Sequence, residues 1–332
     1  MGMDGAVRLD GLREAAATVD AVTLDVARFG LDRTQPHRSA RRVLYITQAL
    51  AIAAIISGFV WAAIAAPAIT FTTLHFGALA LFGCAILWRL IAASNLTRLL
   101  WRLANPAHFP TYTILCPLYR EANVAPDLVA ALSQIDWPKE ALDIQLLVED
   151  DDIDTIVAAL SVSAAPHIEV VIIPACTPRT KPKALNVGLA RARGEFVVVY
   201  DAEDRPHPQQ LRAALAAFED GGEDLACVQS PLSIDNADAS WIARQFAAEY
   251  AIQFREMLPL LARLDLPLPL GGTSNHFRTQ ALRGAGGWDP FNVSKDRAQN
   301  IMISDDFSQR DFTHPIRVSF KTEGKQGLER AA

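Results

Sequence analysis

The segment FVVVYDAEDRPHP, residues 196–208, carries three acidic residues directly after an apolar run: Asp201, Glu203 and Asp204. Carboxylates this close repel one another unless a cation or solvent compensates their charge. Side chains alternate along an extended chain, so Asp201 and Glu203 would point the same way and converge on one hard cation. Mg²⁺ or Mn²⁺ held by one or two carboxylates and by substrate phosphates is a common arrangement, with Asp204 as a further ligand or support.

Two lysines, Lys181 and Lys183 in the segment RTKPKALN, precede a predicted helix. Lysines there can meet phosphate oxygens with help from the helix N-terminus, although a solvated loop explains them equally well. A cation held by the acids would offset the charge of a departing diphosphate. Together with the lysines, it indicates a site for a nucleotide diphosphate. This reasoning leaves the base and the sugar open.

Strands and helices alternate after Pro110. Strands are predicted at 111–119, 143–152, 168–174, 195–204 and 225–232, and helices at 124–135, 154–162, 183–193 and 208–220. This alternation predicts βαβ units, a parallel sheet and helices on both of its faces.

Polar clusters at 117–121, 149–152 and 201–204 follow three predicted strand ends. Ligands bind at the carboxyl ends of strands in such sheets, so the three clusters together indicate one site. Any single cluster is more often a solvated loop or a helix cap.

A long uncharged stretch near the N-terminus predicts a membrane hairpin. No charged residue lies between Arg42 and Arg89, a stretch of 46 residues. A span needs about 20 residues, so helices are predicted at 43–65 and 70–92. Arginines flank the outer ends of both helices and the link between them has none, which predicts that both ends are cytoplasmic, in an inner or plasma membrane. A very apolar soluble hairpin is the alternative.

The composition of the chain argues against some classes of partner and metal. The hydrophobic content is 51%, the net charge is −6, and no run of Lys or Arg is present, so nucleic acid is not an expected partner. The four cysteines form no C-x-x-C, so no zinc site is indicated. The segment 240–264 has one apolar stripe, which can lie at a lipid interface or pack on the sheet. Residues 12–29 predict a short amphipathic helix of no assigned role.

In their order and spacing, these motifs resemble a family-2 glycosyltransferase of the membrane-bound, cellulose-synthase-like kind. The resemblance implies a GT-A fold, an α/β domain with a mostly parallel sheet and flanking helices, preceded by the two-helix transmembrane hairpin. The implied domains are a cytoplasmic N-terminal segment at 1–42, the hairpin at 43–92, the GT-A domain at 110–293 and a divergent polar tail at 294–332.

The first two clusters resemble the family's nucleotide-binding loops. PLYRE resembles P-x-Y-N-E, which implies that Pro117, Tyr119 and Glu121 bind the donor, with an Arg in place of the usual Asn. EDDD resembles the acidic cluster that contacts the uracil or ribose, and Asp151 is the favoured residue, with Asp150 next.

The remaining motifs resemble the diphosphate and acceptor sides of the family's site. KPKALN resembles the lysine segment near the diphosphate, with Lys183 favoured and Lys181 as the alternative. DAED resembles the metal-binding D-x-D variant, which implies Asp201 and Glu203 as ligands and Asp201 beside the donor. GGTSNHFR resembles an acceptor-side segment. It implies that three residues lie near the acceptor and pyrophosphate: Gly272, Thr273 and Arg278.

The resemblance changes after Val293. Relatives carry T-E-D with the Asp as general base, whereas this chain has Ser294, Lys295 and Asp296, so Asp296 takes the base position. The neighbouring Lys would lower the pKa of that carboxyl and weaken it as a base. No Q-x-x-R-W follows, and the tail is therefore expected to be truncated or out of frame relative to its relatives.

The resemblance implies an inverting glycosyltransferase of polysaccharide biosynthesis that depends on Mg²⁺ or Mn²⁺. The donor would be a nucleotide sugar, with UDP favoured, and the acceptor a carbohydrate or lipid-linked hydroxyl at the cytoplasmic face of the membrane. One alternative is a catalytically impaired nucleotide-sugar-binding remnant or partner subunit. Another is a sugar-nucleotide pyrophosphorylase, which the lack of a Gly-rich loop near the first strand disfavours.

Overall fold

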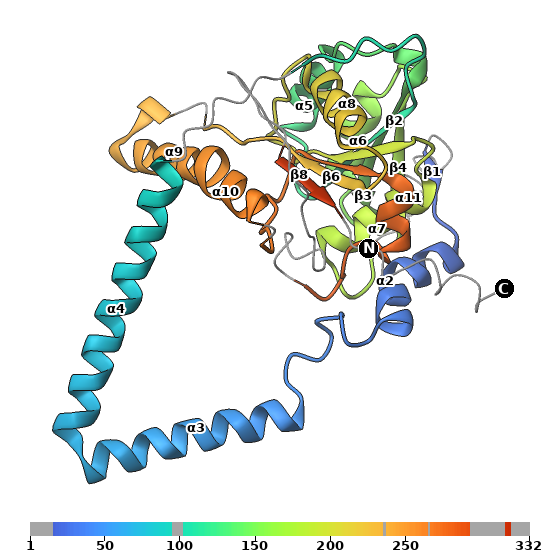
Figure 1. Cartoon of the computed structure of the whole chain (residues 1–332). Coiled ribbons are helices and arrows are strands. Elements are labelled where there is room, and N and C mark those ends of the chain that lie inside the picture. Colours follow the sequence, from blue (N-terminus) through green and yellow to red (C-terminus); the bar gives the residue numbers. More distant parts are fainter. Residues whose placement is uncertain (1–15, 95–101, 235–236, 265, 293–315, 320–332) are drawn as a thin grey trace. The chain divides into compact units, whose positions relative to one another are not determined.

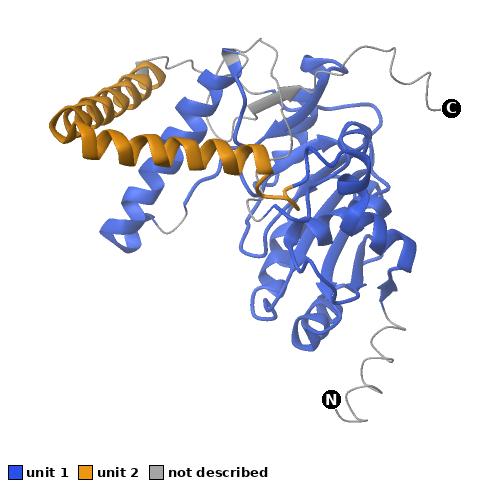
Figure 2. Ribbon diagram, turned by 90° about the horizontal axis from the view of Figure 1, so that it is seen from below, with its two compact units in different colours: residues 1–39, 97–332 blue, residues 40–96 orange. Residues whose placement is uncertain are grey.

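The structure is a computed structural model that describes residues 16–94, 102–234, 237–264, 266–292 and 316–319. The chain divides into two compact units, one formed by residues 1–39 and 97–332 and the other by residues 40–96 (Figure 2). Unit 1 contains the sheet and unit 2 contains two long helices (Figure 1).

The sheet of unit 1 has eight strands within the described residues, in the order β1-β4-β3-β2-β5-β7-β6-β8. Strands β1, β4, β3, β2 and β5 pair in parallel, and β7 and β8 run opposite to their neighbours. The prediction of a mostly parallel α/β sheet is confirmed. In sheet order the strands span Ala17–Thr18, Ile168–Ile173, Leu142–Glu149, Tyr112–Leu118, Phe196–Val199, Asn275–Arg278, Leu225–Gln229 and Ile316–Ser319.

Helices cover both faces of this sheet. Alternation along β2 sends Ile114 into one core with Leu128 of α5 and Leu215 of α8. It sends Leu115 into the other core with Val187 of α7. Because both faces of the sheet are buried, the strands have apolar side chains at nearly every position rather than at alternate ones. The helices of unit 1 are α2 (Ala21–Thr34), α5 (Ala125–Ser133), α6 (Ile153–Val162), α7 (Lys181–Arg191), α8 (Gln210–Gly221), α9 (Trp241–Ile252), α10 (Leu258–Arg263) and α11 (Thr279–Gly284).

The segment before the hairpin belongs to unit 1. Strand β1 extends the sheet by pairing Ala17 with Val171 of β4. Asp20 caps α2 by accepting from the backbone N–H groups of Val22 and Thr23, as acidic N-cap residues do. Helix α2 packs on α7, where Asn186 Nδ2 donates to the carbonyl of Ala27 at 3.1 Å. Periodicity predicts a helix here but not its attachment.

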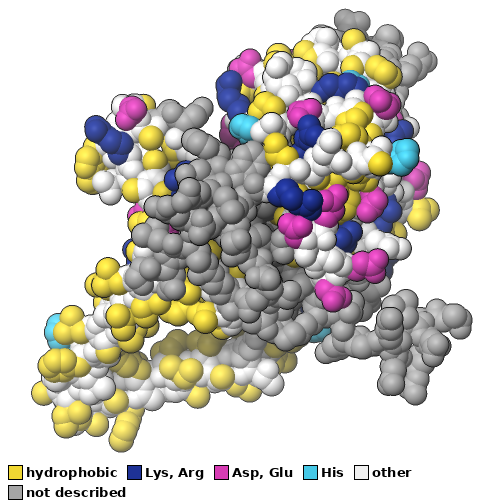
Figure 3. All heavy atoms as spheres, turned by 45° about the horizontal axis from the view of Figure 1, so that its top comes forward, with side chains coloured by type: hydrophobic (Ala, Val, Ile, Leu, Met, Phe, Trp, Pro, Cys, Tyr) yellow, Lys and Arg dark blue, Asp and Glu magenta, His cyan; other side chains and the backbone are white. Residues whose placement is uncertain are grey.

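Unit 2 consists of α3 (Ile46–Ala65) and α4 (Pro67–Ser94). Both are long and apolar enough to cross a membrane, with a mean hydropathy of 2.0 and almost no buried residues. Figure 3 shows hydrophobic side chains over these helices and charged side chains over unit 1. The turn lies at Ala66, within the predicted link at 66–69. Helix α4 begins at Pro67, earlier than predicted, because the first position of a helix needs no backbone donor.

Candidate active site

A cavity of about 290 Å³ lies at the carboxyl ends of β2, β3 and β5. Ligands bind at this edge of doubly wound sheets because loops from several strands meet there. The structure brings residues from all three polar clusters to this one cavity. Its polar and charged lining includes Tyr119, Glu121, Glu149, Arg179, Lys181, Asp201 and Glu203, with Pro117 beside them.

A tight turn positions Asp201. Strand β5 ends at Val199, and the backbone N–H of Asp204 donates to the carbonyl of Asp201 at 3.1 Å. The carboxylate of Asp204 accepts from the backbone N–H of Asp201 at 2.7 Å and from the hydroxyl of Thr273. The extended conformation expected for this segment is therefore wrong, and alternation does not aim its acids. Asp201 and Glu203 nevertheless both line the cavity, and Asp204 braces the turn.

Lys181 lies in the cavity as the first residue of α7. Its ammonium group donates to the carboxylate of Asp201 and to the carbonyl oxygen of Gly272, the latter at 3.0 Å. The Lys181 and Asp201 side chains are 13% and 16% exposed. Gly272 and Thr273 of the predicted acceptor-side segment are thus tied to the Asp201 turn.

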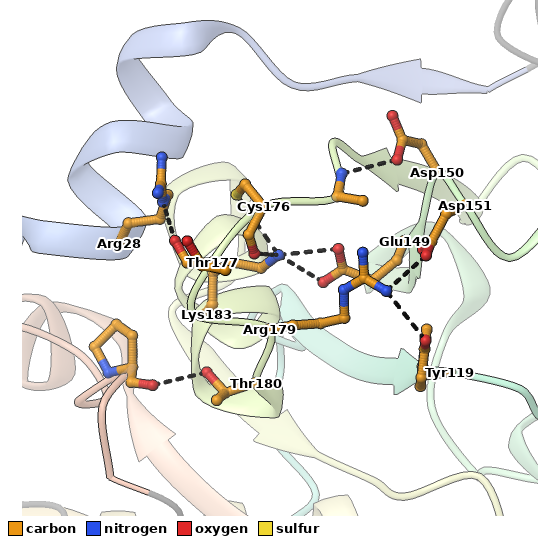
Figure 4. Close-up of polar contacts among 12 residues, drawn as sticks. Arg28, Tyr119, Glu149, Asp150, Asp151, Cys176, Thr177, Arg179, Thr180 and Lys183 are labelled. Carbon is orange, nitrogen blue, oxygen red and sulfur yellow. Dashed lines mark hydrogen bonds and ion pairs between the residues drawn. The ribbon is translucent and has the colours of Figure 1, made fainter.

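Lys183, the lysine favoured by the sequence, lies behind the cavity instead. Successive helical residues turn by about 100°, so the side chain two positions after Lys181 leaves on another face of α7. Lys183 is fully buried, and its ammonium group contacts the two carboxylate oxygens of Glu149 at 2.7 and 2.9 Å (Figure 4). Burial raises the pKa of Glu149, and the hydrogen bond from Lys183 opposes that rise. Lys183 therefore holds a carboxylate that lines the cavity.

Arg179 joins two of the predicted donor-side residues, although no motif in the sequence indicates it. Its guanidinium donates to the hydroxyl of Tyr119 at 3.2 Å and to the carboxylate of Asp151 at 2.6 Å (Figure 4). It also lies over the Tyr119 ring, 5.9 Å from the centroid. Asp151 is thus linked to the cavity through Arg179.

The other acids after β3 have structural partners. Asp150 accepts from the backbone N–H of Ala175 at 2.8 Å. Asp152 caps α6 and accepts from the backbone N–H of Arg120. Arg120 adopts a left-handed conformation with φ of 59°, which Asn, the residue expected there in relatives, tolerates better than Arg.

Arg278, predicted to lie near the acceptor and pyrophosphate, is at the far end of the sheet from the cavity. Arg278 pairs with Phe196 at the amino end of β5, the opposite end of the strand from Asp201. Its guanidinium donates to the carbonyls of Leu225 and Gly222, because β7 runs antiparallel and carries the chain away from the cavity. The expected position of Arg278 near the pyrophosphate is therefore corrected. Asp296, the predicted base, lies outside the described residues.

The described residues contain no cluster of three or more His, Cys, Asp or Glu side chains arranged to hold a metal. The cavity instead offers two carboxylates, Asp201 and Glu203. Such a set fits Mg²⁺ or Mn²⁺, which are usually bound by one or two carboxylates with substrate phosphates and water supplying the remaining ligands.

The sheet order, the flanking helices and a polar cavity at the carboxyl ends of β2, β3 and β5 define a GT-A type domain. The model of the family "Glycosyltransferase like family 2" matches residues 110–305, more than half of the chain. The chain belongs to this family, and the predicted family resemblance is confirmed.

Two similar proteins illustrate the relationship. Glucomannan 4-beta-mannosyltransferase 1 of Oryza sativa subsp. japonica is 26% identical over 205 residues, which are 59% of this chain and 39% of the relative. The mannosyltransferase PcManGT from Pyrobaculum calidifontis, solved with GDP-Man and Mn²⁺, has 22% identity and a TM-score of 0.51, covering 69% of this chain and 60% of that one. The chain thus spans about two-fifths of the curated relative's length.

Proposed function

We propose that this chain is a membrane-bound inverting glycosyltransferase that moves a sugar from a nucleotide diphosphate donor to a hydroxyl acceptor. The observation that carries the proposal is the convergence of three strand ends on one cavity lined by two cations, a Tyr and four carboxylates. Four of the predicted donor residues, Pro117, Tyr119, Glu121 and Asp201, lie in that lining.

The donor diphosphate is proposed to bind between Arg179 and Lys181. Both cations line the cavity, and Lys181 begins α7, whose N-terminus favours negative charge. The nucleotide base is proposed to lie against Tyr119, whose ring already contacts the Arg179 guanidinium. The ion pair of Asp151 and Arg179 would face the polar edge of that base. UDP is the favoured nucleotide. The mannosyltransferase relatives, one of them solved with GDP-Man, make GDP-mannose the second donor to test.

Asp201 and Glu203 are the residues that would hold Mg²⁺ or Mn²⁺. When bound, the ion would stabilise the negative charge that the departing nucleotide diphosphate acquires. Asp204 and Thr273 support this pair, because their hydrogen bonds fix the backbone of the turn that carries Asp201.

The acceptor is proposed to enter beside Gly272 and Thr273, which border the Asp201 turn. Asp296 would remove the acceptor proton, and the freed oxygen would attack the anomeric carbon from the face opposite the diphosphate. The sugar is thereby transferred with inversion. The proton passes to Asp296 and the electron pair of the broken bond leaves on the diphosphate.

A membrane location is part of the proposal, with the GT-A domain on the cytoplasmic side. Helices α3 and α4 are long and apolar enough to cross a bilayer, and arginines flank their outer ends. Helix α9 adds exposed apolar side chains that suit a lipid interface, namely Trp241, Ile242 and Phe246. Membrane lipid and a carbohydrate or lipid-linked acceptor are the proposed partners.

A catalytically impaired nucleotide-sugar-binding protein is the second candidate. It is favoured by one observation, the Lys295 that stands beside Asp296 where relatives carry Glu. Such a protein would keep the donor cavity and bind nucleotide without turnover.

The test measures sugar transfer or donor hydrolysis by the detergent-solubilised full chain with Mn²⁺ and a panel of UDP-sugars and GDP-mannose. Asp201→Ala and Asp296→Asn are expected to lower turnover by about 100-fold or more, a typical loss for an electrostatic or acid–base group. The matched control is Asp154→Asn, an exposed carboxylate in the first turn of α6. Turnover that survives Asp201→Ala refutes the metal role. Nucleotide binding without turnover, unchanged by Asp296→Asn, supports the impaired form.

A further inference from the structure

The ammonium group of Lys181 lies between two oxygen ligands at the cavity. One is the carboxylate of Asp201 and the other is the carbonyl of Gly272, 3.0 Å away. The Lys181 and Asp201 side chains are largely shielded from water, which makes a charge pair stronger than at an open surface. A carboxylate and a backbone carbonyl are hard oxygen ligands, the kind that Mg²⁺ and Mn²⁺ prefer.

We infer that Lys181 occupies the cation position on Asp201 in the nucleotide-free chain, so that a divalent metal binds tightly only after a diphosphate has drawn the lysine away. This inference rests on the proposed function and deepens it. It assigns Lys181 the task of coupling metal binding to donor binding.

Lys181 is the partner that moves, because Asp201 is fixed and lysine is not. The backbone N–H of Asp201 is bonded to Asp204 and Thr273, so the turn fixes the backbone that carries this short side chain. Lysine carries a compact charge on a flexible four-carbon stem and can change partners by rotating that stem. The nearby alternative partner is a diphosphate at the N-terminus of α7 beside Arg179.

Charge balance links the two events. A divalent ion placed on Asp201 while Lys181 remains there would set a double positive charge beside a single one. A nucleoside diphosphate removes this conflict, because its oxygens accept the Lys181 ammonium and also ligate the metal. The two ligands therefore favour each other's binding, and such coupling is reciprocal.

The experiment measures Mn²⁺ binding to the detergent-solubilised full chain by electron paramagnetic resonance of free Mn²⁺, first without nucleotide. Lys181→Gln is expected to bind Mn²⁺ about tenfold more tightly than wild type, which corresponds to about 1.4 kcal/mol. The matched control is Arg179→Gln, which removes one positive charge from the same cavity but leaves the Asp201 pair. We expect it to change the Mn²⁺ dissociation constant by less than about threefold, since it touches no ligand of the ion. Lys181→Arg keeps a cation beside Asp201, so its Mn²⁺ affinity is expected to remain as low as that of wild type.

A second measurement uses the wild-type chain, so the test does not depend on whether a variant folds. Saturating UDP, or GDP where UDP does not bind, is expected to tighten Mn²⁺ binding about tenfold or more, after correction for Mn²⁺ held by free nucleotide. The same nucleotide should tighten Mn²⁺ binding to Lys181→Gln far less.

Three results would overturn the inference. One is an unchanged Mn²⁺ affinity in Lys181→Gln, which would mean that the lysine does not compete with the metal for Asp201. Another is equal tightening by Arg179→Gln, which would mean that only the general charge of the cavity matters. The third is wild-type Mn²⁺ binding that nucleotide leaves unchanged. The nucleotide-free comparison needs no sugar transfer, so it decides the inference even where the proposed activity fails.

Discussion

The buried pair of Lys183 and Glu149 makes a measurable prediction about stability. Lys183 is fully buried and Glu149 nearly so, with 2.7 Å between ammonium and carboxylate. Lys183→Met keeps a similar volume but leaves Glu149 without its cation. Removing one partner of a buried pair costs about 3–5 kcal/mol, because the other charge stays desolvated. At about 2–4 °C per kcal/mol for a domain of this size, the melting temperature should fall by roughly 10 °C.

The loss should depend on pH in a defined direction. Burial already raises the pKa of Glu149, and the loss of Lys183 removes the hydrogen bond that opposes the rise. A carboxyl whose folded pKa is raised favours folding below the unfolded value of about 4.3 and loses that contribution as pH rises through the folded value. The variant should therefore lie closest to wild type near pH 4, and the difference in unfolding free energy should grow toward pH 7.

The assay is denaturant unfolding of the solubilised chain at pH 4, 5.5 and 7, followed by tryptophan fluorescence. The double variant with Glu149→Gln should cost less than the sum of the single variants by about 1–3 kcal/mol, since the two residues are in contact. Lys139→Met is the matched control, because the Lys139 ammonium lies on the carbonyls of Ser133 and Ile135 and has no carboxylate there. A loss below about 1 kcal/mol at pH 7, typical of an exposed pair, or a loss independent of pH, would refute this reasoning.

Two further predictions concern the sheet. Burial lowers the pKa of His276 to about 3, so this group should cost wild type about 1.4 kcal/mol of unfolding free energy for each pH unit between pH 6 and 4. In His276→Gln, the unfolding free energy measured by urea titration should fall less steeply with pH. An equal pH dependence in the two proteins would contradict the prediction. A Cβ at Gly194 would meet backbone atoms of Thr113 and Phe196 at 2.5 and 2.6 Å, whereas one at Gly188 meets only leucine side-chain ends. Gly194→Ala should therefore cost about 3 kcal/mol, and Gly188→Ala about 1 kcal/mol, in thermal melts; a reversed order would be the contrary result.

Local periodicity was enough to predict the strands and helices that build the cavity. The apolar runs of β2, β3 and β5 and the acids that follow them can be seen in the sequence. Because strand ends of a parallel sheet share one edge, these acids could be assigned to one site. The side-chain directions were not visible. The choice between Lys181 and Lys183 depends on where α7 begins, and the aim of Asp201 depends on a turn that is closed from a distance by Thr273.

Non-local pairing explains the larger differences. Strand β7 spans only four residues, Asn275–Arg278, and its partners in β5 lie 78 to 82 positions earlier in the chain. A segment this short has no periodicity that would predict it. Its antiparallel direction is what removes Arg278 from the cavity. Arg179 was missed for a related reason. Its contacts with Tyr119 and Asp151 come from two other strand ends, and the segment that carries it has no regular period.

The attachment of α2 to α7 has a consequence for the path of the chain. Strand β1 and α2 come before the two apolar helices, yet they belong to the same folded unit as strands β2 to β7, which come after those helices. A polypeptide that leaves one body and re-enters it must traverse any intervening bilayer an even number of times. Separating residue 39 from residue 102 would require unfolding the sheet edge at Ala17 and the contact between α2 and α7.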